Sequence, residues 1–158
     1  MNESASGLAR CVVVGYDGSQ YARDALAHAV ERVSLGGKLL AVYGYGGEIP
    51  ADIGSLRSMQ VREEQEALGR ETLERMRAEC ADLLAGTEYD TKLLPEPPAS
   101  ALVDAARTHD ADEIVVGTRG FGDTRTWLGS VSHELLRISD RPVVVIPPAE
   151  RSISRDAP

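Results

Sequence analysis

Residues 117–130 contain the clearest chemical pattern in the sequence. Gly117, Gly120 and Gly122 follow a short apolar run, and glycine allows both positive φ and close approach of the backbone to a ligand. Gly129 and Ser130 then begin a helical pattern, and the free amides at a helix N-terminus favour an anion. The segment therefore predicts a phosphate-binding loop, with an ordinary glycine-rich turn as the alternative.

Polar side chains within this segment favour the same prediction. Arg119 and Arg125 place positive charge among the glycines, where a guanidinium group can contact phosphate oxygens. The hydroxyl of Ser130 can donate a hydrogen bond to a ligand, or it can cap its own helix. The sequence leaves both roles of Ser130 open.

A second loop, residues 15–19, offers a carboxylate. Asp17 comes soon after an apolar run, where it can accept hydrogen bonds from a ribose or from an adenine amine. The alternative is that Asp17 caps the following helix, with Gly18 making the turn. Ligands of open α/β sheets bind at the carboxyl ends of strands, where the connections reverse direction. A shared site therefore requires the strands before Asp17 and Gly117 to be neighbours.

Other familiar sites are not supported by the sequence. The chain has no GxxxxGK[ST] motif, which excludes a Walker-type NTPase, and Gly15 and Gly18 do not complete a GxGxxG motif. The three histidines are scattered. Cys11 and Cys80 have no metal-like or redox-like spacing and are expected to be buried thiols.

The elements that must position these loops alternate along the chain. Short apolar runs predict strands at residues 11–14, 39–43, 89–94, 114–116 and 143–146. The third of these runs alternates and is expected nearer an edge of the sheet. Helical patterns occupy residues 19–33, 55–84, 100–109 and 129–139. Ser19 is expected to cap the first helix, and Gly36 with Gly37 to end it. This order predicts an α/β fold with a doubly wound parallel sheet.

Length and composition define the broad class of protein. The chain has 158 residues, of which 42% are hydrophobic and 27% charged, which suits a single globular domain. Residues 1–8 and 150–158 are expected to be flexible termini. The formal net charge of −8 disfavours nucleic acid or an anionic membrane as the main partner. The sequence contains no recognisable signal segment or membrane span, so a cytoplasmic location is expected.

Three stretches of the chain are similar to those of a known family. They are VVVGYDGSQYARDAL at 12–26, VVGTRGFGDTRTWLGSVSHELL at 115–136 and RPVVVIP at 141–147. Together they resemble the universal stress protein family, and the resemblance spans nearly the whole chain. ATP-binding members share a G-x2-G-x9-G-[ST] pattern. Gly117, Gly120, Gly129 and Ser130 match it, with eight residues, 121–128, in place of nine.

The resemblance implies a Rossmann-like sheet of five parallel strands in the order 3-2-1-4-5, with helices on both faces. It also implies an ATP site in which Asp17 contacts the ribose or the adenine. Gly15 and the backbone near Val42 would line the base pocket, and Val116 is also expected to belong to the ATP site. The phosphates would be surrounded by Gly117, Arg119, Gly120, Gly129, Ser130 and Val131. Mg²⁺ would be held by the phosphates and water, since no cluster of carboxylates or histidines offers a cage.

The resemblance further implies a stress-response or regulatory protein that binds an adenine nucleotide and acts through ligand-dependent interactions with a protein partner. A homodimer is expected through the last strand, which begins near Pro142 and ends at Ile146, because exposed apolar edge strands favour pairing. One alternative is a slow ATPase or phosphotransferase, for which Asp17 is the only obvious carboxylate near the loops. Another is a nucleotide-free interaction module of the same fold, which the shortened 121–128 segment favours.

Overall fold

The computed structural model describes residues 8–47, 49–119 and 128–148. The strands are β1 (Ala9–Gly15), β2 (Val33–Gly44), β3 (Glu88–Leu94), β4 (Glu113–Gly117) and β5 (Val143–Ile146). The helices are α1 (Gln20–Arg32), α2 (Ser55–Glu79), α3 (Ala81–Leu84), α4 (Pro98–Thr108) and α5 (Ser130–Ile138). Apart from Leu8, the two termini that were expected to be flexible lie outside the described residues.

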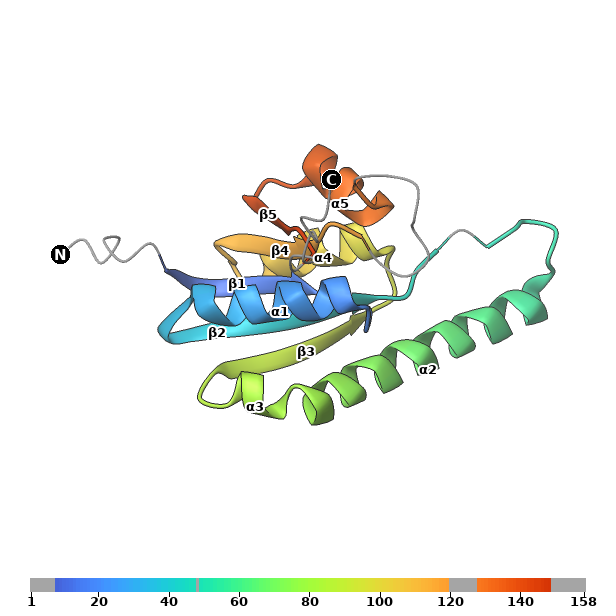
Figure 1. Cartoon of the computed structure of the whole chain (residues 1–158). Helices are drawn as coiled ribbons and strands as arrows, with labels where there is room; N and C mark the ends of the chain where they lie inside the picture. Colours follow the sequence, from blue (N-terminus) through green and yellow to red (C-terminus); the bar gives the residue numbers. More distant parts are fainter. Residues whose placement is uncertain (1–7, 48, 120–127, 149–158) are drawn as a thin grey trace, which may run out of the picture.

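The five strands form one parallel sheet in the order β3-β2-β1-β4-β5 (Figure 1), which confirms the predicted fold class and strand order. β3, expected nearer an edge, is an edge strand. β1 pairs with β2 on one side and with β4 on the other. The connections therefore reverse direction between β1 and β4. A site shared by Asp17 and Gly117 required these two strands to be neighbours. The carboxyl ends of β1 and β4 meet at one edge of the sheet.

Both faces of the sheet are covered by helices. Side chains of a strand alternate between its two faces, and the central valines of β1 follow this rule. Val12 and Val14 pack in the core with α1 and with parts of α2 and α3, whereas Val13 packs with α4 and α5. All three are fully buried. Burial on both faces is the reason that the strand is continuously apolar in sequence.

Helix α1 begins and ends close to the predicted residues, but a different feature ends it. The side chain of Ser19 accepts a hydrogen bond from the Ala22 amide at 3.2 Å, which confirms Ser19 as the N-cap. The helix ends at Arg32, whose guanidinium donates two hydrogen bonds of 2.8 Å to the buried carboxylate of Glu113 on β4. The prediction that Gly36 and Gly37 end the helix is wrong, because Val33 is already extended and pairs with Ala9 of β1.

Two other helix boundaries differ from those predicted. The single helix expected over 55–84 breaks at Cys80, whose ψ of 17° ends α2 before α3 begins. Cys80 and Leu84 are buried in the core under α1, so the chain turns toward the sheet there. Helix α4 begins at Pro98 rather than Ser100. Proline suits the first helical position because its missing N–H would have no partner there.

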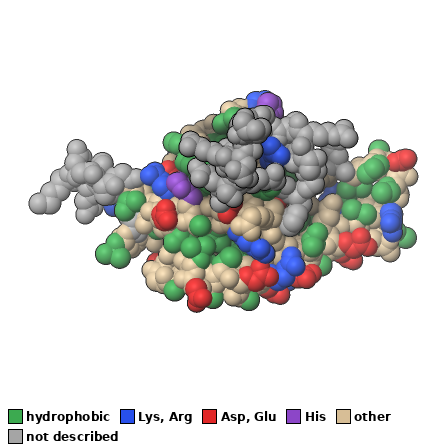
Figure 2. Space-filling model, viewed as in Figure 1, with side chains coloured by type: hydrophobic (Ala, Val, Ile, Leu, Met, Phe, Trp, Pro, Cys, Tyr) green, Lys and Arg blue, Asp and Glu red, His purple; other side chains and the backbone are tan. Residues whose placement is uncertain are grey.

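Helix α2 extends well past the sheet (Figure 1). Its buried residues, Gly69, Thr72, Leu73 and Met76, all lie in its C-terminal half. Toward its other end Leu56 and Met59 are exposed, and hydrophobic side chains lie among charged ones on the projecting part (Figure 2). None of the described helices has the length and apolarity needed to cross a membrane.

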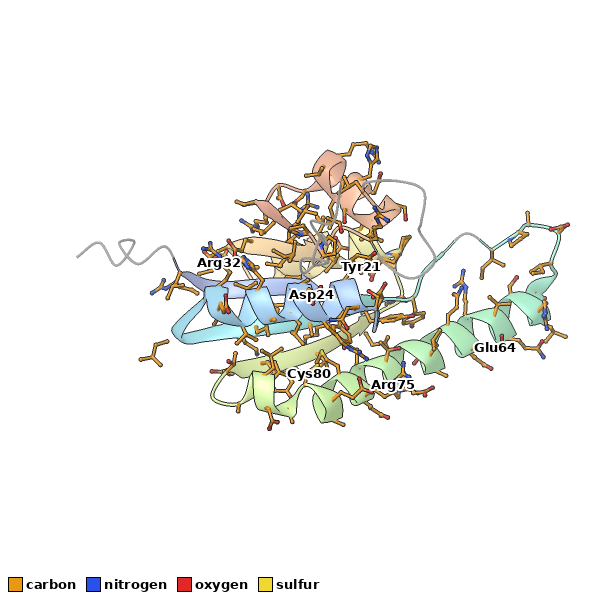
Figure 3. The ribbon with its side chains drawn as sticks, in the orientation of Figure 1. Tyr21, Asp24, Arg32, Glu64, Arg75 and Cys80 are labelled. Carbon is orange, nitrogen blue, oxygen red and sulfur yellow. The ribbon has the colours of Figure 1, made fainter. Side chains whose placement is uncertain are left out.

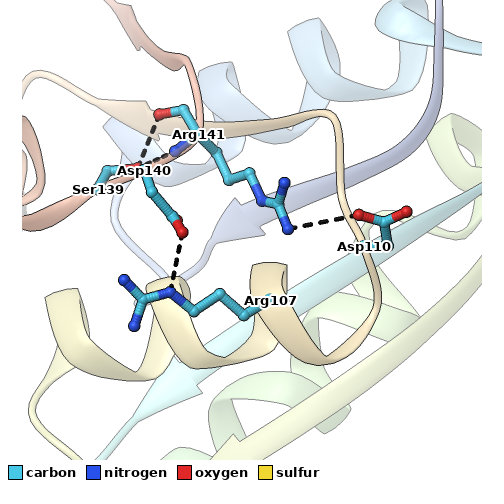
Figure 4. Close-up of polar contacts among 5 residues, drawn as sticks. All are labelled: Arg107, Asp110, Ser139, Asp140 and Arg141. Carbon is cyan, nitrogen blue, oxygen red and sulfur yellow. Dashed lines mark hydrogen bonds and ion pairs between the residues drawn. The ribbon is translucent and has the colours of Figure 1, made fainter.

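A polar cluster joins the segments that lead into β4 and β5 (Figure 4). Arg107 pairs with Asp140 at 3.1 Å, and Arg141 pairs with Asp110 at 3.4 Å. The Ser139 hydroxyl donates to the Arg141 carbonyl at 2.7 Å and accepts from its amide at 3.0 Å. Because these residues precede the two strands, the cluster lies at the amino edge of the sheet. The two loops predicted to bind a ligand, residues 15–19 and 117–130, follow strands and lie at the opposite edge. We assign it a structural role.

Candidate functional site

A cavity of about 470 Å³ opens at the carboxyl edge of the sheet. Its floor is the end of β1, β2 and β4, and its walls come from α2, α4 and the start of α5. Nine of the ten residues predicted to bind the ligand line this cavity; the tenth, Gly120, lies outside the described residues. The nine are Gly15, Asp17, Val42, Val116, Gly117, Arg119, Gly129, Ser130 and Val131. The topology therefore brings both predicted loops to one place.

The N-terminus of α5 faces this cavity. Gly129 occupies the N-cap position, with φ −67° and ψ 165°, and has no side chain with which to cap the helix. The first bond of the helix runs from the His133 amide to the Gly129 carbonyl at 3.0 Å. The preceding amides, those of Ser130, Val131 and Ser132, have no partner within the helix. Since these residues line the cavity, the helix offers it amide donors and its positive dipole end.

Two serines at the start of α5 have different positions. Ser130 is the first residue of the helix rather than its cap, so the capping role that the sequence left open falls to Gly129. Ser132 is 2% exposed, and its hydroxyl donates to the Gly117 carbonyl at 2.7 Å. The Gly129 amide also donates to the Thr118 carbonyl at 2.6 Å. These two bonds hold the helix N-terminus against the end of β4.

Gly117 is required for packing on a helix. Its φ is not among the positive values of the described glycines, so the sequence-based argument from positive φ is wrong here. A Cβ at this position would lie 2.7 Å from both the Cβ and the carbonyl oxygen of Tyr21 on α1. Close approach of β4 to α1 therefore accounts for the glycine. Gly120 and Gly122 lie outside the described residues, as do Phe121, Arg125 and Trp127.

Asp17 lies in the turn between β1 and α1 and lines the cavity. One carboxylate oxygen, Oδ1, accepts a hydrogen bond of 2.9 Å from the Ser19 amide. Ser19 itself caps the helix, so the alternative in which Asp17 is the cap is not what the structure has. The Tyr16 amide donates to the Val42 carbonyl at 3.0 Å, which ties this turn to β2. Asp17 is thus held in a half-buried position beside the cavity.

The charges around the cavity are of both signs. Arg119 and Arg75 line it together with the Asp17 carboxylate. Burial, and then the nearby charge of Asp17, raise the pKa of Tyr43. The Tyr43 hydroxyl is protonated at neutral pH, as an unshifted tyrosine would also be, and can act as a donor. The combination of a carboxylate, amide donors and guanidinium groups suits a ligand that has both hydroxyl groups and negative charge.

Several cavity residues were not predicted from the sequence. They come from β2, α2 and α4, and are Tyr43, Leu68, Thr72, Arg75, Pro98 and Leu102. Residues 55–84 were predicted only as a helix, yet Arg75 in this range lines the cavity. Tyr43 was recognised only as a strand residue. No local pattern marks these positions, because they reach the site through the packing of α2 and α4 on the sheet.

The chain belongs to the universal stress protein family, whose sequence model matches residues 9–147. A universal stress protein of Thermus aquaticus, encoded in the 3′ region of a QAH/OAS sulfhydrylase, is 35% identical over 141 residues. That alignment covers 87% of this chain and 98% of the relative. The family assigned by resemblance is therefore confirmed.

Solved structures share the fold. The universal stress protein UspA of Lactobacillus plantarum superposes with a TM-score of 0.71 at 20% identity, covering 88% of this chain and 98% of its own. A universal stress protein solved in complex with cAMP superposes with a TM-score of 0.56 at 23% identity, covering 90% and 99%. Two further members, from Archaeoglobus fulgidus and Arabidopsis thaliana, are described with dAMP and AMP bound.

Proposed function

We propose that the protein binds an adenine nucleotide in the cavity at the carboxyl edge of the sheet and acts as a stress-response regulator. The observation that carries the proposal is the placement of Asp17 and the α5 N-terminus on one cavity, at the point where the sheet connections reverse. The nucleotides present in solved members of the family support the ligand class. A bound nucleotide would change the affinity for a protein partner, because it favours one conformation of the cavity walls over another.

Each part of the nucleotide has a proposed partner. Asp17 accepts from the ribose hydroxyls or the adenine amine, and Gly15, Val42 and Val116 line the base pocket. Phosphate oxygens accept from the amides of Ser130 and Val131, with Gly117 and Gly129 close by and Arg119 adding charge. Gly120 is proposed as a further phosphate residue from the sequence pattern alone. We propose ATP as the ligand. Asp17 is the only carboxylate among the described residues of the cavity lining, so Mg²⁺ would be held by phosphates and water.

Binding of ATP and AMP, measured by isothermal titration calorimetry, tests the proposal. Asp17→Asn is expected to weaken both by about tenfold, because hydrogen bonds to a charged acceptor contribute about 1.5–3 kcal/mol. Asp52→Asn is the matched control, since Asp52 is exposed and does not line the cavity. It should bind as the wild type does. Absence of heat with every adenine nucleotide would end the proposal.

We also propose a homodimer formed through β5. This strand has β4 as its single neighbour in the sheet and is wholly apolar from Val143 to Ile146, with each residue only half-buried. Apolar edges of this kind pair readily with another chain. Sedimentation velocity is expected to give twice the monomer mass, and Val144→Lys is expected to shift the protein to the monomer. A wild type that sediments as a monomer at all concentrations would contradict this proposal.

A further inference from the structure

The wall of the cavity that α2 provides is a single helix face. Leu68, Thr72 and Arg75 are spaced by four and three residues, so they lie one above another along the helix. Figure 3 places Arg75 on the part of α2 that runs beside the sheet, with Glu64 farther out on the projecting part. An apolar, a hydroxyl and a cationic side chain therefore follow each other along one side of the cavity.

Packing at Gly69 holds this face in place. A Cβ on Gly69 would lie 2.6 Å from Leu93 Cδ1 and 2.8 Å from Tyr43 Cδ1, so the helix backbone sits directly on side chains of β2 and β3. One turn later Thr72 is buried, and its hydroxyl donates to the Leu68 carbonyl at 2.8 Å. The α2 wall is consequently fixed relative to the strands that form the floor.

Arg75 differs from the other arginines of this part of α2. Arg70 pairs with Glu66 at 2.8 Å, and Arg77 donates to Thr91 at 2.6 Å in a separate groove. Arg75 is exposed and has no hydrogen bond or ion pair within the part of the chain that the structure describes. Leu68, about two turns away on the same cavity wall, is 53% exposed. The face thus presents an uncovered apolar group and an unengaged guanidinium to the same space.

The sheet order sets which part of a ligand meets this face. Helix α5 starts after β4, whereas α2 contacts β2 and β3. In the sheet, β1 lies between β2 and β4. Neighbouring strands are about 4.8 Å apart, so β2 and β4 are separated by roughly 10 Å. A nucleotide with its phosphate on the α5 amides and its sugar beside Asp17, at the end of β1, directs its base toward β2 and α2.

We propose that Arg75 is a base-contact residue: its planar guanidinium packs on the face of the purine ring, while Leu68 covers the same face. Arginine is suited to this role because its flat, weakly hydrated group stacks on aromatic rings. The inference rests on the proposed nucleotide site. Arg75 would contact the base directly, and α2 would form part of the ligand-binding surface.

Comparing AMP with adenosine separates a base contact from attraction to the phosphate. Arg75→Gln is expected to weaken both ligands by the same factor, about fivefold, since a cation–π contact contributes about 1 kcal/mol. Arg75→Lys should recover only part of the affinity, because it keeps a cation near the ring and loses the planar group that stacks on it. Arg57→Gln, the same change of charge at the far end of α2, should bind both ligands as the wild type does. Calorimetry serves for AMP and saturation-transfer NMR for adenosine.

The other results are equally decisive. If Arg75→Gln weakened AMP and left adenosine unchanged, Arg75 would act on the phosphate and the base contact would be refuted. Full affinity in Arg75→Gln, full recovery in Arg75→Lys, or a wild type that binds AMP without any binding of adenosine would refute it as well. A wild type that binds no adenine nucleotide would instead refute the nucleotide site on which this inference rests.

Discussion

Replacing Gly117 with alanine is expected to lower the free energy of unfolding by about 2–3 kcal/mol. The new Cβ would lie 2.7 Å from the carbonyl oxygen of Tyr21, and 2.8 Å from its carbonyl carbon. Both atoms belong to the backbone of α1, which cannot move aside as the end of a flexible side chain would. Overpacking of a tight interior typically costs about 1–3 kcal/mol, and this contact is between two packed elements.

Gly47→Ala provides the matched control for this prediction. A Cβ on Gly47 would have no heavy atom of the described residues within 4 Å, and the φ of Gly47 does not lie in the positive region. Alanine there should leave stability unchanged or raise it slightly, because it restricts the unfolded chain. Urea unfolding followed by circular dichroism measures both variants. Equal stability of Gly117→Ala and the wild type would show that α1 and β4 are not packed as closely as the structure has them.

Gly129→Glu is expected to weaken binding of ATP and AMP by about 100-fold or more. Gly129 is the N-cap of α5, directly before the amides assigned to the phosphates. Two charges of the same sign about 4 Å apart repel by about 4 kcal/mol at the effective dielectric of a protein surface. The new carboxylate would also take the place at the helix N-terminus that suits an anion.

Folding and binding can be separated at this position. The φ of −67° at Gly129 is open to any residue, and a carboxylate near a helix N-terminus favours the helix. Gly129→Glu should therefore unfold at a temperature close to that of the wild type. Gly129→Ala, which adds bulk without charge, should keep its affinity within a few-fold. Unchanged calorimetric affinity of Gly129→Glu would place the phosphates away from α5.

Much of the fold could be predicted from residues that are close in sequence. Strands buried on both faces appear as continuous apolar runs, which is why all five strands were found from the pattern alone. Ser19 was identified as a cap because a cap is a local hydrogen bond, here to the Ala22 amide. The strand order required the family resemblance, since apolar runs do not state which strands are neighbours.

Errors arose where distant segments decide the local structure. Gly36 and Gly37 have the composition of a helix end, but pairing of Val33 with Ala9 and the bond between Arg32 and Glu113 end the helix earlier. The break at Cys80 depends on a core that α1 completes. In each case the residue that ends the helix does so through a contact with a residue far away in sequence. No local sequence pattern could therefore predict where the helix ends.

The sequence by itself determined the chemistry of the site: a carboxylate at Asp17, and glycines followed by a helix N-terminus at Gly129. These features are local, because turns, caps and helix amides depend on neighbouring residues. Only the tertiary structure decided that Gly117 allows β4 to pack closely on Tyr21 of α1. It also decided that Leu68, Thr72 and Arg75 line the cavity. The physical reason is that the face of a helix directed at a site depends on how the helix packs on the sheet.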